Sequence, residues 1–324
     1  MQKIPLPERV VEGKYFASLK HKVIDSGICS HCGACASICP AYGIIVDPNK
    51  PIDFPNWEEN CLDCGLCIKI CPRWDYKPKS GLGEYLEIFA AKSRRFKGQD
   101  GGIVTEILAI ALEEGIIDRA VVVTRDENWY PKAITVTKVD QLKQASGTKY
   151  SFAPSLLELR KAVFRSKNGV GFVGTPCMIS GLRSLQKIKS FRKVKLAIGL
   201  FCMENFYYDQ LAKFLADKGI ELRDANWIGI SKGKFIVKLS DGEKSFPVKE
   251  LNPIVPSGCK VCEDFTAIES DVSVGSVGSP EGFSTVIVRT EIGKEIAEIL
   301  KDRCEVGDVN LKIVEKLCEL KRKH

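Results

Sequence analysis

One spacing of cysteines occurs twice in the sequence, and this repeat constrains the fold more than any other feature. The spacing C-x2-C-x2-C-x3-C-P is found at Cys29, Cys32, Cys35 and Cys39 before Pro40, and again at Cys61, Cys64, Cys67 and Cys71 before Pro72. Three thiolates separated by two residues can surround one iron-sulfur cubane. The fourth follows a short helical turn that proline ends, and it can reach a neighbouring cubane.

The repeat is typical of bacterial ferredoxins with two clusters, in which the fourth cysteine of each run binds the other cluster. We therefore predict one 4Fe-4S cluster on Cys29, Cys32, Cys35 and Cys71, and a second on Cys61, Cys64, Cys67 and Cys39. A pair of zinc sites is the alternative, because C-x2-C pairs serve both metals. Zinc explains neither the third cysteine of each run nor the two prolines, so we favour a small α+β ferredoxin-like domain.

The remaining sequence argues against a secreted disulfide scaffold. The chain has 324 residues with 14 cysteines, 44% hydrophobic and 27% charged residues, which is enough for two domains with cores of their own. No apolar run reaches the roughly 18 residues of a membrane span, and Met1 to Val10 lacks the apolar block of a signal peptide. We expect a cytoplasmic protein with no membrane span, with peripheral association at the cytoplasmic face of a membrane complex left open.

A change in sequence character near Ser80 predicts a boundary between a domain at 1–82 and a domain at 83–324. Periodicity predicts strands at 86–91, 119–124, 170–173 and 195–201, helices at 103–114, 155–166, from 178, 294–301 and 311–320, and an antiparallel hairpin at 227–239. Alternating strands and helices indicate an α/β catalytic core, here with a mixed sheet that is largely parallel.

Six cysteines lie outside the repeat. Cys177 and Cys202 follow predicted strand ends, and Cys259 and Cys262 form a C-x2-C pair. Because the carboxyl ends of parallel strands gather at one edge of a sheet, these four could form a third four-thiolate site, with buried core thiols as the competing interpretation. Cys304 and Cys318 have no partner at ligand spacing, and we predict that they pack in the core.

The positive charge of the chain, +7 overall, is concentrated in one stretch. Between 159 and 203 there are ten basic residues and no acidic one: Arg160, Lys161, Arg165, Lys167, Arg183, Lys187, Lys189, Arg192, Lys193 and Lys195. This favours an anionic ligand or a docking surface, with a solvated face as the alternative. Nucleic acid is not expected, because no nucleic-acid recognition motif accompanies the stretch.

Glycine motifs give weaker signals. Gly169, Gly171 and Gly174 match G-x-G-x-x-G, but they lie inside a predicted strand, so we reject a dinucleotide site there. Gly101 and Gly102 precede the helix predicted from Ile103, with Thr105 in its first turn, where free backbone N–H groups could bind phosphate.

Six motifs in one order resemble the coenzyme F420 hydrogenase/dehydrogenase beta-subunit family. They are Lys97–Thr105, Ser146–Tyr150, Val173–Cys177, Gly199–Glu204, Gly258–Cys262 and Asp271–Thr290, so the resemblance covers about Glu84 to Thr290. With two ferredoxin clusters in front, the chain is most similar to the electron-input subunit type found in F420H2 dehydrogenases.

The resemblance implies FAD beside a third 4Fe-4S cluster on Cys177, Cys202, Cys259 and Cys262. It also implies that Gly101, Gly102 and Thr105 hold the FAD phosphates, that Ser146, Lys149 and Thr175 lie against the cofactor, and that Gly275, Gly278, Ser284 and Thr285 border the isoalloxazine ring. No catalytic acid or base is needed, and His21, His31 and His324 lie outside the expected flavin core.

The implied activity is hydride transfer from reduced coenzyme F420 to FAD, followed by single-electron transfer through three 4Fe-4S clusters, with the reverse reaction left open. The acceptor would be a redox partner such as an F420H2 dehydrogenase complex, a ferredoxin or a reductase subunit, and the basic stretch is a candidate clamp for the anionic tail of coenzyme F420. Two alternatives stay open: a ferredoxin-driven flavin reductase of an organic double bond, and an electron-transfer subunit without flavin.

Overall fold

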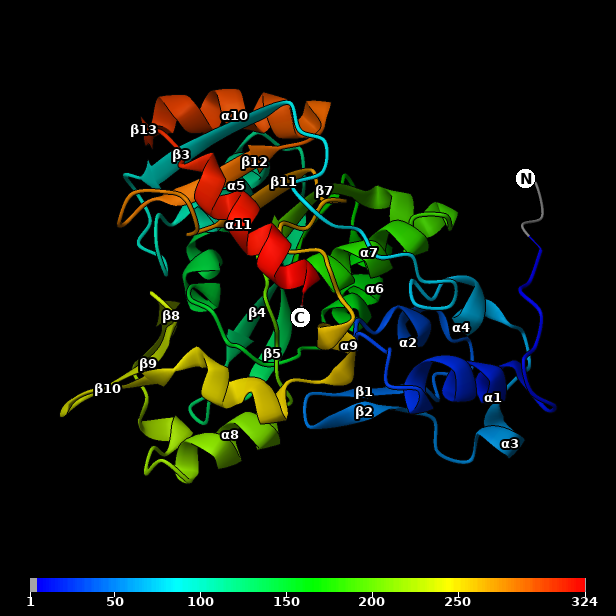
Figure 1. Ribbon diagram of the computed structural model, residues 1–324. Helices are drawn as coiled ribbons and strands as arrows, with labels where there is room; N and C mark the ends of the chain where they lie inside the picture. The colour runs from blue at the N-terminus through cyan, green and yellow to red at the C-terminus, as the bar shows by residue number, and fades with distance from the viewer. Residues whose placement is uncertain (1–4, 324) are drawn as a thin grey trace.

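An eight-stranded mixed sheet forms the centre of the computed structural model, which describes residues 5–323 (Figure 1). The strand order is β13-β3-β12-β11-β7-β6-β4-β5. The bounds are β3 (Glu87–Ser93), β4 (Arg119–Arg125), β5 (Pro131–Val136), β6 (Val170–Gly174), β7 (Val194–Leu200), β11 (Val272–Gly275), β12 (Ser284–Val288) and β13 (Cys304–Gly307). The α/β core with a mixed sheet is therefore confirmed.

The direction of the strands brings distant loops together. Strands β4, β6, β7 and β11 are parallel, and β12 is antiparallel to both β11 and β3, so β3 points the same way as the parallel strands. The carboxyl ends of these five strands meet at one edge, which we call the loop edge. It consists of segments 94–102, 126–130, 175–177, 201–206 and 276–283. The sheet is less parallel than the sequence predicted, because β5, β12 and β13 run in the opposite direction.

Helices cover both faces of the sheet. Helices α5 (Ile103–Glu113) and α10 (Glu291–Arg303) pack on one face, and α6 (Ser155–Arg165) and α7 (Pro176–Leu185) pack on the other. Side chains of β7 alternate between the two cores, with Ile198 on the α5 side and Ala197 on the α7 side. Cys304 and Cys318 are each 2% exposed, which confirms the prediction that they are core residues.

The N-terminal cysteine region combines short helices with a two-stranded sheet. Its elements are α1 (Tyr15–Leu19), η1 (Lys20–Asp25), α2 (Ala34–Ile38), β1 (Ile45–Asp47), β2 (Lys50–Asp53), α3 (Trp57–Asn60) and α4 (Leu66–Lys69). Its core contains Phe16, Phe54 and Trp74 together with cysteine side chains. A short helix follows the second cysteine of each run and contains the third, as the spacing predicted. The division of the chain at residue 82 stays a prediction.

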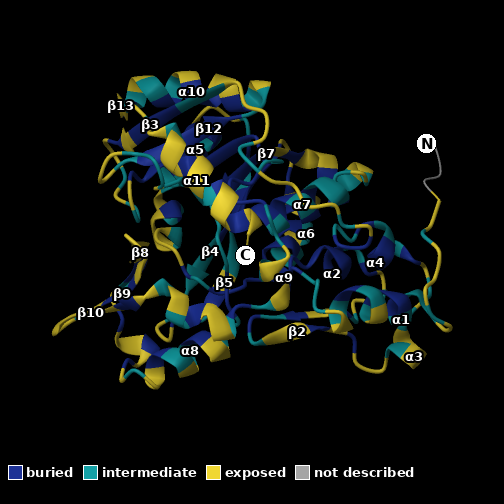
Figure 2. Ribbon diagram, viewed as in Figure 1, coloured by how far each residue is buried: buried dark blue, intermediate teal, exposed yellow. Residues whose placement is uncertain are grey.

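The remaining elements are η2 (Val139–Ala145), η3 (Lys189–Lys193), α8 (Tyr208–Ala216), η4 (Leu222–Asp224), β8 (Trp227–Ser231), β9 (Lys234–Leu239), β10 (Gly242–Pro247), η5 (Val248–Ile254), α9 (Ser257–Lys260) and α11 (Leu311–Arg322). They include β8–β10 and α8, at the lower left of Figure 1, and α11, which crosses its front. The predicted hairpin is β8–β9, to which β10 adds a third strand with an exposed turn (Figure 2). Across residues 5–323, no helix combines the length and the apolar character needed to cross a bilayer.

The N-terminal region packs directly on the core through its first cysteine run. A Cβ atom at Gly258 would lie 2.0 Å from the carbonyl oxygen of Cys29, and one at Gly181 would lie 3.1 Å from Cys32 Sγ. The His31 ring packs 4.8 Å from the ring of Phe152, between centroids. Glycine is therefore required where α9 approaches the Cys29 backbone.

We expect G258A to lower the free energy of unfolding by about 1–3 kcal/mol, because the added methyl group overpacks a contact with the backbone. The measurement is thermal or denaturant unfolding of anaerobically purified protein. The matched control is G307A, since a Cβ at Gly307 would meet its nearest neighbour at 3.7 Å, an ordinary contact distance. Equal destabilisation in both variants would contradict the close approach.

Candidate functional site

The first predicted cysteine set lines one cavity. Cys29, Cys32, Cys35 and Cys71 surround it together with apolar side chains that include Leu19, Val23, Ile24 and Ile52. Burial raises the pKa of the Cys35 thiol far above its usual range, and repulsion from Cys32, Cys71 and Cys29 raises it further. The cavity thus has four sulfur donors and an apolar lining, which fits a 4Fe-4S cluster.

The second predicted set also comes together. Burial raises the pKa of Cys67 to about 12, with further increases from Cys61, Cys64 and Cys39. The exchange of the fourth cysteine between the runs is therefore visible in space, since Cys39 neighbours the second set and Cys71 the first. Cys64 is exposed, so the second set reaches the protein surface.

The third set joins three separate segments at or beside the loop edge. Cys177 lies in the first turn of α7, Cys202 follows β7, Cys259 lies in α9 and Cys262 follows it. Burial raises the pKa of Cys202 far above its usual range; Lys321 lowers it, while Cys259, Cys177 and Cys262 raise it. The structure therefore brings together the four cysteines that the sequence could only place at strand ends.

The first and third sets are neighbours. Burial raises the pKa of Cys177 to about 12, and Cys32 is among the thiols whose charge adds to this increase. A groove of about 400 Å³ between α7 and residues 68–79 is lined by cysteines of both sets, namely Cys71, Cys177 and Cys262. None of these cysteines forms a disulfide bond. Within residues 5–323, no three His, Cys, Asp or Glu side chains are grouped to hold a single metal ion.

At the loop edge, Gly101 and Gly102 have a packing role. A Cβ at Gly101 would lie 2.5 Å from Ala91 O, and one at Gly102, whose φ is +70°, would lie 2.2 Å from Phe96 O. The amide of Gly101 donates to Ser284 Oγ at 3.1 Å. The first-turn N–H groups of α5, including that of Thr105, have no side-chain cap, so they are free to bind an anion.

Ser146 and Lys149 shape a neighbouring loop. Lys149 Nζ donates to the carbonyls of Ala145 and Gly147, each at 2.7 Å, and of Ser146 at 3.1 Å. Ser146 Oγ donates to Lys97 O at 3.3 Å. Burial lowers the pKa of Lys149 to about 7, whereas three carbonyl acceptors favour the charged form. In this structure the ammonium group of Lys149 is hydrogen-bonded within its own loop and is not presented as a free group.

The remaining residues predicted to contact the flavin also lie close to other atoms of the protein. A Cβ at Gly275 would lie 2.2 Å from the Phe201 ring, and one at Gly278, with φ +89°, would lie 2.6 Å from a methyl group of Val314. The hydroxyl group of Thr285 donates to Val277 O at 2.8 Å. Thr175 Oγ1 lies 3.3 Å from Cys177 Sγ, which places this residue beside the third cysteine set.

Two buried cations beside the cysteines were missed by the sequence analysis. Arg73 and Lys321 are each 3% exposed. Arg73 follows the Cys71-Pro72 pair, so its position in the motif was a usable signal. Lys321 lies on α11, whose packing on α9 depends on contacts between residues far apart in the sequence, and nothing local in the sequence marks it.

The basic stretch does not form one surface at the loop edge. Arg183 pairs with Asp271 at 2.9 Å, and Lys193 Nζ donates to Ser166 O at 2.9 Å. Because β7 begins at Val194, Arg192, Lys193 and Lys195 lie at the amino ends of the parallel strands, opposite the loop edge. The hypothesis that the whole stretch clamps coenzyme F420 is therefore not supported by the fold.

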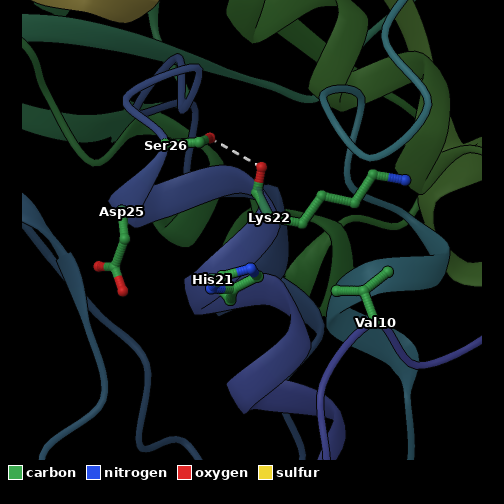
Figure 3. Close-up of a pocket in the computed structure, with 5 residues that line it drawn as sticks. All are labelled: Val10, His21, Lys22, Asp25 and Ser26. Carbon is green, nitrogen blue, oxygen red and sulfur yellow. Dashed lines mark hydrogen bonds between the residues drawn. The ribbon is translucent and has the colours of Figure 1, made fainter.

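A separate depression on the N-terminal region is lined by Val10, His21, Lys22, Asp25 and Ser26 (Figure 3). Ser26 Oγ donates to Lys22 O at 2.7 Å, and Lys22 pairs with Asp75 at 3.0 Å. The lining contains no cysteine. This depression therefore plays no part in the candidate site.

Comparison with known families matches three parts of the chain. Residues 28–75 match a 4Fe-4S dicluster domain, residues 88–160 match the N-terminal part of the coenzyme F420 hydrogenase/dehydrogenase beta subunit, and residues 167–312 match its C-terminal part. The dicluster match covers all eight cysteines of the repeat. The other two matches cover the loop edge and the third cysteine set.

Individual relatives agree with these matches. The chain is 39% identical to a coenzyme F420-dependent sulfite reductase of Methanocaldococcus jannaschii over 94% of its length, but it spans only 50% of that relative. It is 36% identical to a subunit of the F420H2 dehydrogenase of Methanosarcina mazei, over 93% of this chain and 91% of that protein. Among solved structures, a chain of the F420-reducing [NiFe] hydrogenase complex of Methanosarcina barkeri is 33% identical, with a TM-score of 0.71, over 76% of this chain and 92% of that one.

The contacts of Lys149 lead to a test of its role. We expect K149M to lower the free energy of unfolding of flavin-free protein by about 1–3 kcal/mol, because the carbonyls of Ala145, Ser146 and Gly147 lose their shared, buried donor. The control is K143M, which removes an exposed lysine from the preceding turn. A K149M protein with wild-type stability but no flavin binding would instead indicate direct contact with the cofactor.

Proposed function

Because the chain belongs to the coenzyme F420 hydrogenase/dehydrogenase beta-subunit family and has an N-terminal 4Fe-4S dicluster domain, we propose that it oxidises reduced coenzyme F420 and passes single electrons to a partner protein. The observation that carries this proposal is the grouping of twelve cysteines into three neighbouring sets. Each set supplies the four thiolates of one 4Fe-4S cluster.

The order of the three sets in space supports a path for electrons. The third set adjoins the loop edge, the first set neighbours the third through Cys32 and Cys177, and the second set neighbours the first through Cys67 and Cys71. The second set ends at the exposed Cys64. We assign this exposed end to electron exchange with the partner.

Bound FAD would supply the chemistry that converts a hydride into two single electrons, which the clusters require. The uncapped first turn of α5, with Thr105, would hold its phosphates. Gly275, Gly278, Ser284 and Thr285 would border the ring, and Lys149 with Ser146 would keep the adjoining loop in place. The protein contributes positioning and exclusion of water at the loop edge.

The partner is proposed from the relatives. Two of them are named as subunits of a dehydrogenase or a hydrogenase that involves coenzyme F420. We therefore propose a redox protein or a larger complex as the acceptor, with electrons able to run in reverse to reduce coenzyme F420.

We expect anaerobically purified protein to contain about twelve irons per chain, from three clusters, and one FAD. It should also convert reduced coenzyme F420 to the oxidised coenzyme when a viologen dye serves as the acceptor, which absorbance spectroscopy measures. Eight irons with no flavin would contradict the enzyme and leave a pure electron-transfer subunit. Flavin without any reaction with coenzyme F420 would favour the reductase of an organic double bond.

A cysteine variant tests the third cluster by itself. We expect C262A to lose about four irons per chain and to retain those of the N-terminal region, since its thiol belongs to the third set alone. The control is C318A, which removes a buried thiol that has no predicted ligand role. Full iron content in C262A, measured by iron analysis and EPR spectroscopy, would remove Cys262 from the ligand set.

A further inference from the structure

Two buried cations from opposite ends of the chain flank the third cysteine set. Arg73 comes from the N-terminal region and Lys321 from the C-terminal helix α11. Figure 1 shows α11, in red, running across the front of the molecule toward α9, which carries Cys259. Burying a cation is costly unless a negative charge or several acceptors compensate.

Arg73 lies between the first and third sets. Its Nη2 donates to the carbonyl of Gly258 at 3.3 Å, and its guanidinium carbon lies 3.8 Å from the centre of the Tyr76 ring. Its charge acts on Cys29 and Cys32 of the first set and on Cys177 and Cys262 of the third set. One side chain therefore faces the thiols of two sets.

The other guanidinium nitrogen of Arg73, Nη1, is buried and has no hydrogen-bond partner among the described residues. A buried charged donor left without a partner costs more than the 1–3 kcal/mol of a neutral one. The sulfur atoms of a cluster are acceptors that would remove this cost, and hydrogen bonds to those sulfurs are known to tune cluster potentials.

Lys321 faces only the third set. Its Nζ donates to the carbonyl of Cys259 at 3.0 Å and also to that of Met203, the residue after Cys202. Its charge acts on the thiols of both Cys202 and Cys259. The ammonium group therefore lies against two of the three segments that carry the third set.

We propose that Arg73 and Lys321 are positioning residues that raise the reduction potential of the third cluster, and that Arg73 also raises that of the first. This inference rests on the proposed clusters. When a cluster accepts one electron, its negative charge increases by one while the cation stays fixed. The buried cation therefore stabilises the reduced form more than the oxidised form, and low dielectric strengthens the effect.

The electrons in this step come from reduced coenzyme F420 and leave to the partner protein, so no other reductant or oxidant is required. A raised potential at the third cluster favours its reduction by the flavin. Because Arg73 acts on the first cluster as well, its charge raises the potentials of both clusters and does not by itself make electron transfer from the third to the first less favourable. The second cluster, with Cys39 and Cys67, has no contact with either cation among the described interactions and serves as an internal reference.

The experiment is an EPR-monitored redox titration of the full-length, iron-loaded protein. We expect R73Q to lower the midpoint potentials of the first and third clusters, and K321Q to lower that of the third cluster only. Glutamine keeps a hydrogen-bond donor while removing the charge. The control is R223Q, which makes the same change of charge on an exposed side chain of η4. Unchanged potentials in R73Q and K321Q would overturn the proposal, as would equal shifts of all three clusters.

Two further measurements keep the result unambiguous. Iron analysis of the wild-type protein comes first. Eight irons per chain would show that the third cluster is absent, which contradicts the proposed function and, with it, the proposed effect of Lys321. If a glutamine variant loses a cluster, R73K or K321R replaces it and retains the charge. Wild-type potentials in these variants would support the proposal, and lowered potentials would overturn it.

Discussion

The rest of this structure depends on one constraint: thiols are buried that must lose their protons before they can bind iron. Burial raises the pKa of Cys35 and Cys202 far above the usual range of a thiol, and neighbouring thiols raise it further. Iron must therefore compensate for desolvation and mutual repulsion, which couples folding of the cysteine loops to cluster binding.

This constraint explains why the N-terminal region and the core of the protein meet at glycines. The first and third sets can be neighbours only if α7 and α9 approach the Cys29 loop closely, and Gly181 and Gly258 allow that approach. At this contact Cys32 is only 7% exposed. Charge compensation then has to come from the protein, and Arg73 and Lys321 are the cations placed there.

The sequence predicted what depends on local spacing and strand order. The exchange of Cys39 and Cys71 between sets follows from the spacing alone, and the meeting of Cys177 with Cys202 follows from two adjacent parallel strands. Packing between residues far apart in the chain could not be predicted, so the contact of Lys321 with the third cysteine set was missed. Gly101 and Gly102 were expected to contact phosphate, yet nearby carbonyl oxygens already require glycine at both positions. The short strands β11 and β13, of four residues each, carry too little periodicity to be recognised.

The arrangement of the three sets also bears on the direction of electron flow. A flavin at the loop edge would exchange electrons first with the third set, whose cysteines come from three different segments of the core. The second set is held entirely by the N-terminal region and reaches the surface at Cys64. On the proposed function, the partner would exchange electrons at the N-terminal region, because the second set reaches the surface there. Arg73 lies between these two parts, so that one charged side chain faces thiols of both the first and the third set.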